Sequence, residues 1–434
     1  MVAWALKNNG VAVLAGVRTP LAKAGTALRR VPVAELARAV MQETLYRAPW
    51  SAERLDEVVL GNVAMPADAA NPARVAALEA GIPPAVPALT VQRNCASVME
   101  AVALAATRIQ AGQAKAVLAG GAESMSTIPM LWPQEVLEPA ARLMAARTLS
   151  QKLRALACLR LRHLRPRLGL QLGLTDPVSG LNMGQTAEVL AHEFAIDRQA
   201  QDDFALRSHR CACQAAQAGR HGPEMMTLYA GPDFAPVGQD VGPRPNQSAE
   251  ALAKLPPLFD RRDGTVTAGN ACQITDGAAA LLLCDASVAS AEGREALGFV
   301  RGYATAALDP ARMGLGPVYA IDRLLQAAGL ALKDVGLFEI NEAFAAQVLA
   351  CLKALASDGF ARQHLGRGRA LGELDPQTLN VNGGAIALGH PVGATGARLV
   401  LTLLLEMRRR GVEFGVAALC VGGGQGAAIL LHGG

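Results

Sequence analysis

The stretches Ala52-Glu-Arg-Leu-Asp-Glu-Val-Val-Leu-Gly-Asn62 and Leu332-Lys-Asp-Val-Gly-Leu-Phe-Glu-Ile-Asn341 have the same design. Each is a short polar link that leads into an apolar run and ends in asparagine. Short apolar runs bounded by polar residues are typical of buried strands. Because the same unit occurs early and late in the chain, we expect two similar halves.

The elements around these two stretches also recur in the same order. The first half has a strand over 10–20, a helix over 32–47, a helix over 98–109 and a strand over 116–122; the second has a strand over 299–303, a helix over 317–328, a helix over 395–410 and a strand over 416–419. One such correspondence could arise by chance, but four in one order favour a duplication. Strands that alternate with helices predict parallel sheets covered on both sides.

Composition narrows the class of protein. The chain has 434 residues, of which 51% are hydrophobic and 4% aromatic, which suits a close-packed α/β protein of two or three units. A net charge of +4 gives no global field for nucleic acid. Eight cysteines without a C-x-x-C pair argue against zinc or disulfide frameworks. With no signal peptide or long apolar run, we expect a cytoplasmic protein.

Residues 126–257 differ in character from the two halves and predict a large insertion. Its segment from Pro139 to Thr175 has no acidic residue and eight basic ones: Arg142, Arg147, Lys152, Arg154, Arg160, Arg162, Arg165 and Arg167. Leucines interleave with them, at 149, 153, 156, 159, 161 and 164. Such a basic amphipathic helix either contacts an anionic membrane or a partner through residues 142–167, or packs its leucines on its own domain.

Cys95 and Cys420 are the candidate thiols for chemistry. Cys95 lies just before the predicted helix over 98–109, and a helix N-terminus favours a thiolate. Cys420 ends a strand-like run and is followed by Gly422 and two more glycines, whose N–H groups are suited to an oxyanion hole. Free cysteines are usually buried and unreactive, so only their positions in the chain mark Cys95 and Cys420 as candidates for chemistry.

His390 and Asn341 complete the candidate site. His390 follows a glycine-rich turn that lets the backbone approach a ligand closely. Its imidazole can accept the Cys95 proton and later donate to an oxyanion. Asn341 can orient a water molecule or donate to a carbonyl oxygen, although asparagine after a strand is ordinary turn chemistry. Together the four segments predict acyl transfer through a thioester.

These segments resemble the active-site motifs of the thiolase family. In order, they are Asn94-Cys-Ala-Ser97, Asn341-Glu-Ala-Phe344, Gly383-Gly-Ala-Ile-Ala-Leu-Gly-His-Pro391 and Cys420-Val-Gly-Gly-Gly424. Residues 264–270 and 276–280 are similar to a further segment on the coenzyme A side. The resemblance extends over essentially the whole chain. Residues 146–153 resemble the insertion in thiolase subunits of fatty-acid β-oxidation multienzyme complexes.

The resemblance implies a duplicated αβαβα layered core with an inserted loop domain. The N-terminal half would comprise residues 1–125 and 258–285, the loop domain 126–257 and the C-terminal half 286–434. It also implies a homodimer or a dimer of dimers. The resemblance also points to a hydratase–dehydrogenase subunit as a partner.

For the site, the resemblance implies a nucleophile at Cys95, its base at His390, and an acid–base thiol at Cys420. One oxyanion hole would use His390 and a water on Asn341, and the other the N–H groups of Cys95 and Gly422. The CoA or substrate contacts would come from four further residues: Met183, Ala271, Cys272 and Phe344. Coenzyme A would be a substrate, with no metal and no permanently bound cofactor.

Three departures leave the subfamily open. Cys272 stands where many thiolases have serine, Asn182 stands where short-chain biosynthetic thiolases have histidine, and Asn341 stands where β-oxidation complex subunits often have histidine. The leading hypothesis is degradative cleavage of 3-ketoacyl-CoA. The alternatives are biosynthetic condensation of two acetyl-CoA, a decarboxylating ketoacyl synthase, and a scaffold that binds acyl-CoA without turnover.

Overall fold

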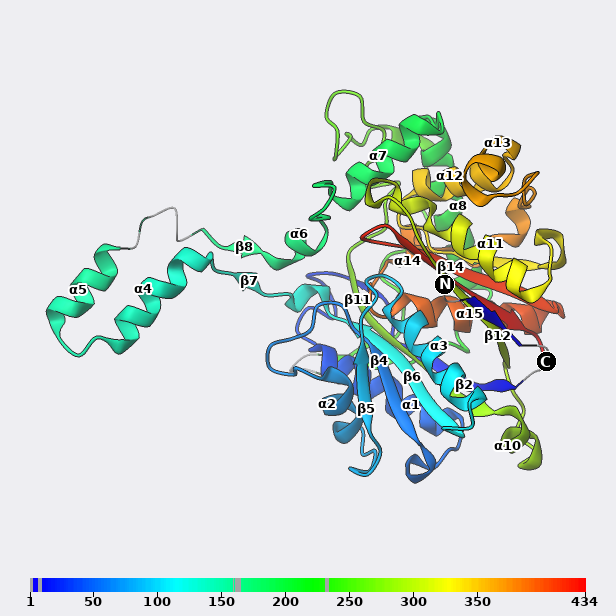
Figure 1. The fold of residues 1–434 in the computed structure, drawn as a ribbon, viewed down its shortest axis with the longest axis horizontal. Coiled ribbons are helices and arrows are strands. Elements are labelled where there is room, and N and C mark those ends of the chain that lie inside the picture. Colours follow the sequence, from blue (N-terminus) through cyan, green and yellow to red (C-terminus); the bar gives the residue numbers. More distant parts are fainter. Residues whose placement is uncertain (1–2, 7–9, 159, 161–164, 231–233) are drawn as a thin grey trace.

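One mixed sheet of eleven strands runs through the molecule (Figure 1). The computed structural model describes residues 3–6, 10–158, 160, 165–230 and 234–434. The strands follow the order β13-β14-β15-β12-β2-β11-β6-β4-β5, and β1 and β3 pair with β12 and β11. Their bounds are β1 Ala3–Ala5, β2 Val11–Arg18, β3 Ala22–Lys23, β4 Glu57–Gly61, β5 Ala88–Val91, β6 Ala116–Glu123, β11 Thr275–Asp285, β12 Gly298–Ala307, β13 Leu337–Ile340, β14 Phe414–Val421 and β15 Gln425–His432.

The stretches 52–62 and 332–341 contain equivalent strands, β4 in the first half and β13 in the second. β4 pairs parallel with β6, so that Gly61 lies opposite Gly121, and β13 pairs parallel with β14, so that Ile340 lies opposite Ala418. The halves join where β12 meets β2. The structure therefore contains the predicted repeat of strand units.

The prediction of parallel sheets is wrong for most strand pairs. Among the pairs of the large sheet, β2–β11, β6–β11, β12–β15 and β14–β15 are antiparallel. β14 and β15 form a hairpin because Gly423 and Gly424 adopt positive φ values of 84° and 74° in the turn between them. The second half also lacks a full counterpart of β5: the described chain near Leu379 makes only an isolated bridge to Phe338.

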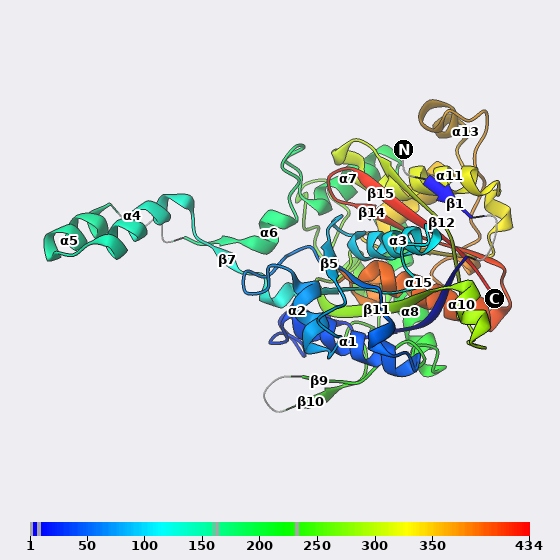
Figure 2. The same ribbon diagram turned by 60° about the horizontal axis from the view of Figure 1, so that its bottom comes forward.

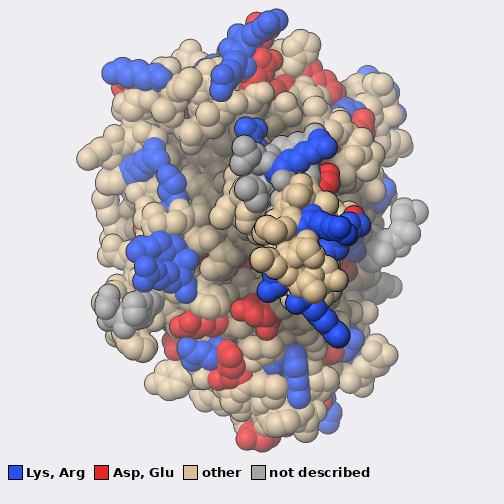
Figure 3. All heavy atoms as spheres, turned by 90° about the vertical axis from the view of Figure 1, so that its left-hand side faces the viewer, with Lys and Arg blue, Asp and Glu red and all other residues tan. Residues whose placement is uncertain are grey.

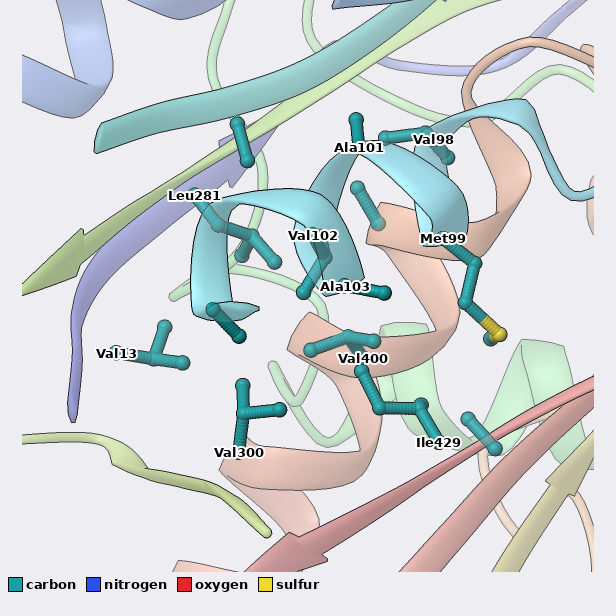
Figure 4. Packing of buried hydrophobic residues seen from close by; sticks show 14 of the residues in the cluster. Val13, Val98, Met99, Ala101, Val102, Ala103, Leu281, Val300, Val400 and Ile429 are labelled. Carbon is teal, nitrogen blue, oxygen red and sulfur yellow. The ribbon is translucent and has the colours of Figure 1, made fainter. Parts of the chain in front are cut away.

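Three layers of helices enclose the sheet on both sides and between its halves. The middle layer consists of α3 (Ser97–Gln110) and α15 (Thr395–Arg410), whose apolar side chains form one core with strands of both halves (Figure 4). Gly396 permits their close approach, since a Cβ there would lie 2.9 Å from Met99. Each fully buried aliphatic side chain in this layer contributes roughly 1.5–3 kcal/mol.

The outer layers combine two helices of the predicted repeat with two helices that were not predicted. α1 (Val33–Arg47) and α2 (Pro72–Glu79) pack on the first half of the sheet, and α11 (Gly316–Ala328) packs on the second (Figure 2). α12 (Ala345–Leu355) joins α11 in the apolar cluster of the second half. The order of layers is therefore αβαβα, as expected. The shorter helices are α6 Gly169–Gly173, α9 Ala249–Ala253, α10 Ala286–Ala291, α13 Asp358–Phe360 and α14 Ala385–Leu388.

The chain between β6 and β11 contains α7 (Met183–Glu193) and α8 (Arg198–Gln217). α8 is capped at its start by Asp197, whose side chain accepts from Ala200 N. α7 begins at Met183 because Asn182 forms a capping box: its Oδ1 accepts from Gln185 N at 2.9 Å, and Gln185 Oε1 accepts from Asn182 N at 3.0 Å. This contact gives Asn182, one of the three departures, a structural role.

An arm formed by α4 (Gln134–Ala145) and α5 (Leu149–Ala157) extends from the body on the short strands β7 (Met130–Leu131) and β8 (Arg167–Leu168) (Figure 1). The prediction of a single basic helix is wrong, because Thr148 caps a second helix with Gln151. The alternative that the leucines pack on the domain is also wrong for those described: Leu149, Leu153 and Leu156 are exposed. The predicted Arg162 and leucines 159, 161 and 164 lie outside the described residues. Within the described part of the chain, no helix combines the length and apolar character needed to span a membrane.

Candidate active site

Cys95 lies on a strained turn in front of α3. Asn94 has a φ of 42°, in the left-handed region that is unfavourable for residues with a Cβ. The Ser97 hydroxyl donates to Asn94 O at 2.7 Å and accepts from Arg93 N at 2.9 Å. These contacts from the first turn of α3 hold the turn, and with it the Cys95 thiol, in one position.

The Cys95 thiol meets the second half of the molecule at the glycine turn after β14. Asn94 Nδ2 donates to Gly422 O at 2.8 Å, and the Gly422 N–H donates to the Cys95 sulfur. Burial nevertheless raises the pKa of Cys95 above its ordinary value and outweighs this hydrogen bond. The favourable effect of the helix N-terminus on the thiolate is therefore outweighed by burial, and Cys95 is a thiol at rest.

Cys420 and Cys272 lie within electrostatic reach of Cys95. Cys420 is 1% exposed at the end of β14, and burial raises its pKa well above the ordinary value, with a further contribution from Cys95. Burial likewise raises the pKa of Cys272 to about 12. Thiols of this kind remain protonated, so Cys420 can act as a proton donor beside Cys95.

His390 is buried, and both of its ring nitrogens have polar neighbours. Its Nδ1 lies 2.6 Å from Thr395 Oγ, and its Nε2 lies 3.4 Å from Asn341 Nδ2. The backbone N–H of His390 donates to Gln273 O, next to Cys272, at 3.2 Å. Burial first, and the positive charge of Arg398 second, lower the pKa of His390 to about 3. The imidazole is therefore neutral at physiological pH and can accept a proton.

Asn341 is fully buried directly after β13, where its N–H donates to Ala418 O at 2.9 Å. Its Oδ1 is buried and finds no hydrogen-bond partner among the described residues. A buried amide oxygen without a partner is costly unless a water or a ligand donates to it. Asn341 thus offers one polar group to His390 and another to a small donor.

The predicted CoA-side residues come together on two paired segments. Ala271 forms a bridge with Phe344, and Cys272 N donates to Ala343 O at 3.0 Å. Met183, at the start of α7, packs in the same apolar cluster as Ala271, Phe344 and Cys420. The paired segments 271–272 and 343–344 therefore lie next to Cys420, one of the two candidate thiols.

Comparisons with known proteins agree with this arrangement. Residues 11–287 match the thiolase N-terminal domain, and residues 294–433 match the thiolase C-terminal domain. The chain belongs to the thiolase family. Similar relatives are the 3-ketoacyl-CoA thiolases of Pseudoalteromonas translucida (41% identical) and Yersinia enterocolitica (42%), each aligned over 98% of this chain and 97% of the relative.

Solved thiolase structures are also similar over the whole fold. The Bacillus anthracis acetyl-CoA acetyltransferase has a TM-score of 0.85 at 38% identity, with 98% of each chain covered. The human mitochondrial 3-ketoacyl-CoA thiolase in complex with CoA has a TM-score of 0.85 at 35% identity, again with 98% of each chain covered. The thiolase fold and family predicted from the motifs are therefore confirmed.

Sequence reasoning missed the buried carboxylates that hold the site segments of this thiolase. Glu342 accepts from Ser208 Oγ at 2.6 Å, Asn380 Nδ2 at 2.9 Å and Ile386 N at 3.2 Å, so it joins three segments. Glu123 accepts from Val63 N at 3.0 Å and from the N–H of Gly393. A charged residue directly after Asn341, inside an otherwise apolar motif, was the available signal for Glu342.

Thr395, the first residue of α15, was also missed. It lies five residues after His390, and its hydroxyl is the group nearest to the imidazole in the hydrogen bonds described above. A hydroxyl at that spacing after a histidine has no recognised pattern, so only the folded turn reveals it.

Proposed function

We propose that this thiolase cleaves 3-ketoacyl-CoA with CoA, yielding acetyl-CoA and an acyl-CoA shortened by two carbons. The observation that carries the proposal is the convergence of the Cys95 thiol on the Gly422 N–H, beside Cys420, with a neutral His390 held by Asn341. The name shared by the bacterial relatives, 3-ketoacyl-CoA thiolase, supports the degradative direction. Coenzyme A acts as a substrate.

In the first step the Cys95 thiol passes its proton to His390 Nε2 while its sulfur attacks the 3-keto carbon. The bond between C2 and C3 then breaks, and its electron pair stays on C2 as the enolate of acetyl-CoA. The Cys420 thiol donates its proton to this carbon, and acetyl-CoA leaves. The acyl group remains on Cys95 as a thioester.

In the second step the Cys420 thiolate removes the proton from the incoming CoA thiol. The CoA sulfur attacks the acyl carbon, and the Cys95 sulfur leaves as the new thioester forms. His390 returns its proton to Cys95, so every group regains its starting state. Both thiols raised in pKa by burial suit this exchange, because each is protonated at rest.

Two sets of donors would stabilise the oxyanions. The N–H groups of Cys95 and Gly422 would serve the tetrahedral intermediates on C3. His390 Nε2–H and a water held by Asn341 would serve the enolate oxygen, and the unpartnered Asn341 Oδ1 supports such a water. Each donor is worth roughly 3 kcal/mol in the barrier.

The CoA arm would lie along Met183, Ala271, Cys272 and Phe344. Backbone pairing of 271–272 with 343–344 fixes this surface without help from the side chain at 272. A backbone contact to the pantetheine therefore survives the replacement of serine by Cys272, whereas a hydroxyl contact does not.

The test is CoA-dependent cleavage of 3-ketoacyl-CoAs from four to sixteen carbons, followed by loss of the enolate absorbance. Turnover that rises with chain length supports the degradative assignment. Activity confined to acetoacetyl-CoA would shift the assignment to biosynthetic condensation. Acylation of Cys95 in a stoichiometric amount, without turnover, would support a binding scaffold and contradict the proposal.

We further propose that the arm contacts an anionic membrane surface. Its described leucines Leu149, Leu153 and Leu156 are exposed, and Met144 is 89% exposed. Of the basic residues, Arg142 lies on α4, Lys152 and Arg154 lie on α5, and Arg147 lies in the turn between the two helices. Figure 3, which looks along the arm, shows blue Lys and Arg side chains beside tan surface at its centre. Apolar and cationic side chains together are what an interfacial helix presents to lipid headgroups.

The proposed assembly follows from the resemblance, and the proposed location follows from the sequence features described above. We propose a cytoplasmic homodimer or dimer of dimers, built from the two halves 1–125 with 258–285 and 286–434 and the loop domain 126–257. A hydratase–dehydrogenase subunit is the partner that would feed 3-ketoacyl-CoA to the site. Light scattering after size exclusion, alone and with such a subunit, measures both.

A further inference from the structure

The shortest contact of His390 is with Thr395. Thr395 Oγ lies 2.6 Å from His390 Nδ1 and 3.0 Å from Pro391 O. Thr395 is 1% exposed, so this pair lies away from bulk solvent. The Thr395 hydroxyl therefore has two polar neighbours. It can donate its proton to one of them, and its oxygen can accept a hydrogen bond from the other.

The neighbours decide where the protons lie at rest. Pro391 O is a carbonyl and only accepts, so the Thr395 hydroxyl donates to it. Thr395 Oγ is then free to accept from Nδ1–H. On the other side of the ring, Asn341 Nδ2 is a donor and faces Nε2 at 3.4 Å, which agrees with an unprotonated Nε2.

We propose that Thr395 is a positioning residue that holds the proton of resting His390 on Nδ1 and so leaves Nε2 unprotonated, as a base that accepts the Cys95 proton must be. This inference rests on the proposed function, in which His390 is the base. Thr395 touches no substrate atom; it acts through the imidazole.

The same contact serves the next state of the reaction. When Cys95 gives its proton to Nε2, the imidazole becomes a cation with protons on both nitrogens. Its Nδ1–H continues to donate to Thr395 Oγ, so the hydrogen bond at Nδ1 is kept as the charge forms, while the Asn341 Nδ2 donor at Nε2 gives way to the new proton. A side chain that cannot accept would leave a buried N–H of the cation without a partner.

A neutral partner also suits a base that must return its proton. A carboxylate beside Nδ1 would stabilise the imidazolium and raise its pKa. Here burial and the charge of Arg398 keep the imidazole neutral, and Thr395 adds orientation without adding charge.

Thr395 is itself held in place from two sides. Its backbone N–H, like that of Ala394, donates to Pro391 O, at 3.1 and 2.8 Å. Glu123 from the first half accepts from the N–H of Gly393 in the same turn. The turn that carries both His390 and Thr395 is thus fixed before substrate arrives.

The experiment follows alkylation of Cys95 by iodoacetamide without substrate, read by mass spectrometry of the peptide that contains residue 95. In the wild type we expect a rate that is flat between about pH 6 and pH 8, because neutral His390 accepts the proton throughout. Thr395→Val removes the acceptor and frees the other tautomer. We expect its rate to fall about tenfold or more and to climb with pH as Cys95 ionises unaided.

Two further variants separate positioning from general damage. Thr395→Ser keeps the hydroxyl and should restore the flat profile. Thr402→Val deletes another buried hydroxyl of α15, one that donates to Glu224 at 2.7 Å, and should lower Tm while leaving the profile flat. A flat profile at the wild-type rate in Thr395→Val would overturn the inference.

Thiolysis by the wild type is measured in parallel. If the wild type cleaves 3-ketoacyl-CoA and Thr395→Val alkylates like it, only the positioning role fails. If the wild type shows no cleavage but the profiles differ as expected, the proposed function fails and the role of Thr395 stands.

Discussion

Glu123 and Cys420 occupy the same position in the two halves of the molecule. Gly121 lies opposite the end of β4 and Ala418 opposite the end of β13, and each is followed two residues later by Glu123 or Cys420. In the second half this position presents a thiol to the site. In the first half it presents a carboxylate that accepts hydrogen bonds from loop backbone, so the same position of the repeat has a structural role there.

The stability of the protein should depend on pH through Glu123. Burial raises the pKa of Glu123 to about 7 in the folded protein, above its unfolded value of 4.5. The folded state therefore binds the proton more tightly, and this contribution is complete below about pH 4.5 and is lost as pH rises through about 7. Protonation of Glu123 therefore adds up to roughly 3 kcal/mol to the free energy of unfolding at low pH.

The measurement compares wild type with Glu123→Gln by denaturant unfolding at pH 5 and at pH 8. Glutamine loses acceptor capacity and should be less stable at pH 5. Its deficit should shrink at pH 8, where the wild type must bury a charge. A deficit that grows with pH would mean that the Glu123 pKa is lowered, contrary to this account.

Asn341→Ala should lower kcat about a hundredfold or more, because it removes the group proposed to hold a water on the enolate oxygen. The KM for CoA should change little. The matched control is Asn62→Ala, at the equivalent position of the first half, where the side chain donates to Ala122 O and Glu123. That variant should keep kcat within about twofold while losing about 1–3 kcal/mol of stability. Equal losses of kcat in both would leave Asn341 without a catalytic role.

The sequence pointed to the candidate site residues that belong to a local sequence pattern. Cys95 before a helix, His390 after a glycine turn and Cys420 before three glycines are local patterns, and the structure places Cys95 and Cys420 within electrostatic reach of each other. The ranges of the four repeat helices were predicted well for the same reason, since apolar spacing and capping residues act within a few positions.

What the sequence could not predict depends on contacts between distant segments. The direction of a strand depends on how the chain returns to the sheet. The antiparallel pairing of β11 with β6 could therefore not be predicted from the residues of either strand. The partners of Glu342 and Thr395 arise only when loops meet. The pKa direction of Cys95 also required the fold, because burial outweighed the helix N-terminus.

Cys95→Ser should abolish turnover, with kcat reduced at least about a thousandfold, because a hydroxyl does not replace the thiol as nucleophile and leaving group. Cys158→Ser is the matched control, since Cys158 is a free and exposed thiol at the end of α5. It should retain wild-type kcat and still be alkylated at Cys95. Substantial turnover in Cys95→Ser would rule out the acyl-enzyme route.

Neutralising the arm should weaken membrane binding and spare catalysis in solution. The test variant combines Arg147→Gln, Lys152→Gln and Arg154→Gln on or beside α5, and the matched control neutralises three exposed basic residues elsewhere: Arg30, Lys333 and Arg369. In sedimentation with vesicles containing phosphatidylserine, three lost charges near the surface should weaken binding by about 3 kcal/mol, or more than a hundredfold. The control should bind like the wild type, and kcat on soluble substrate should be unchanged in both. Equal vesicle binding by all three proteins, with co-purification of a hydratase–dehydrogenase lost only in the arm variant, would instead make the arm a protein-docking surface.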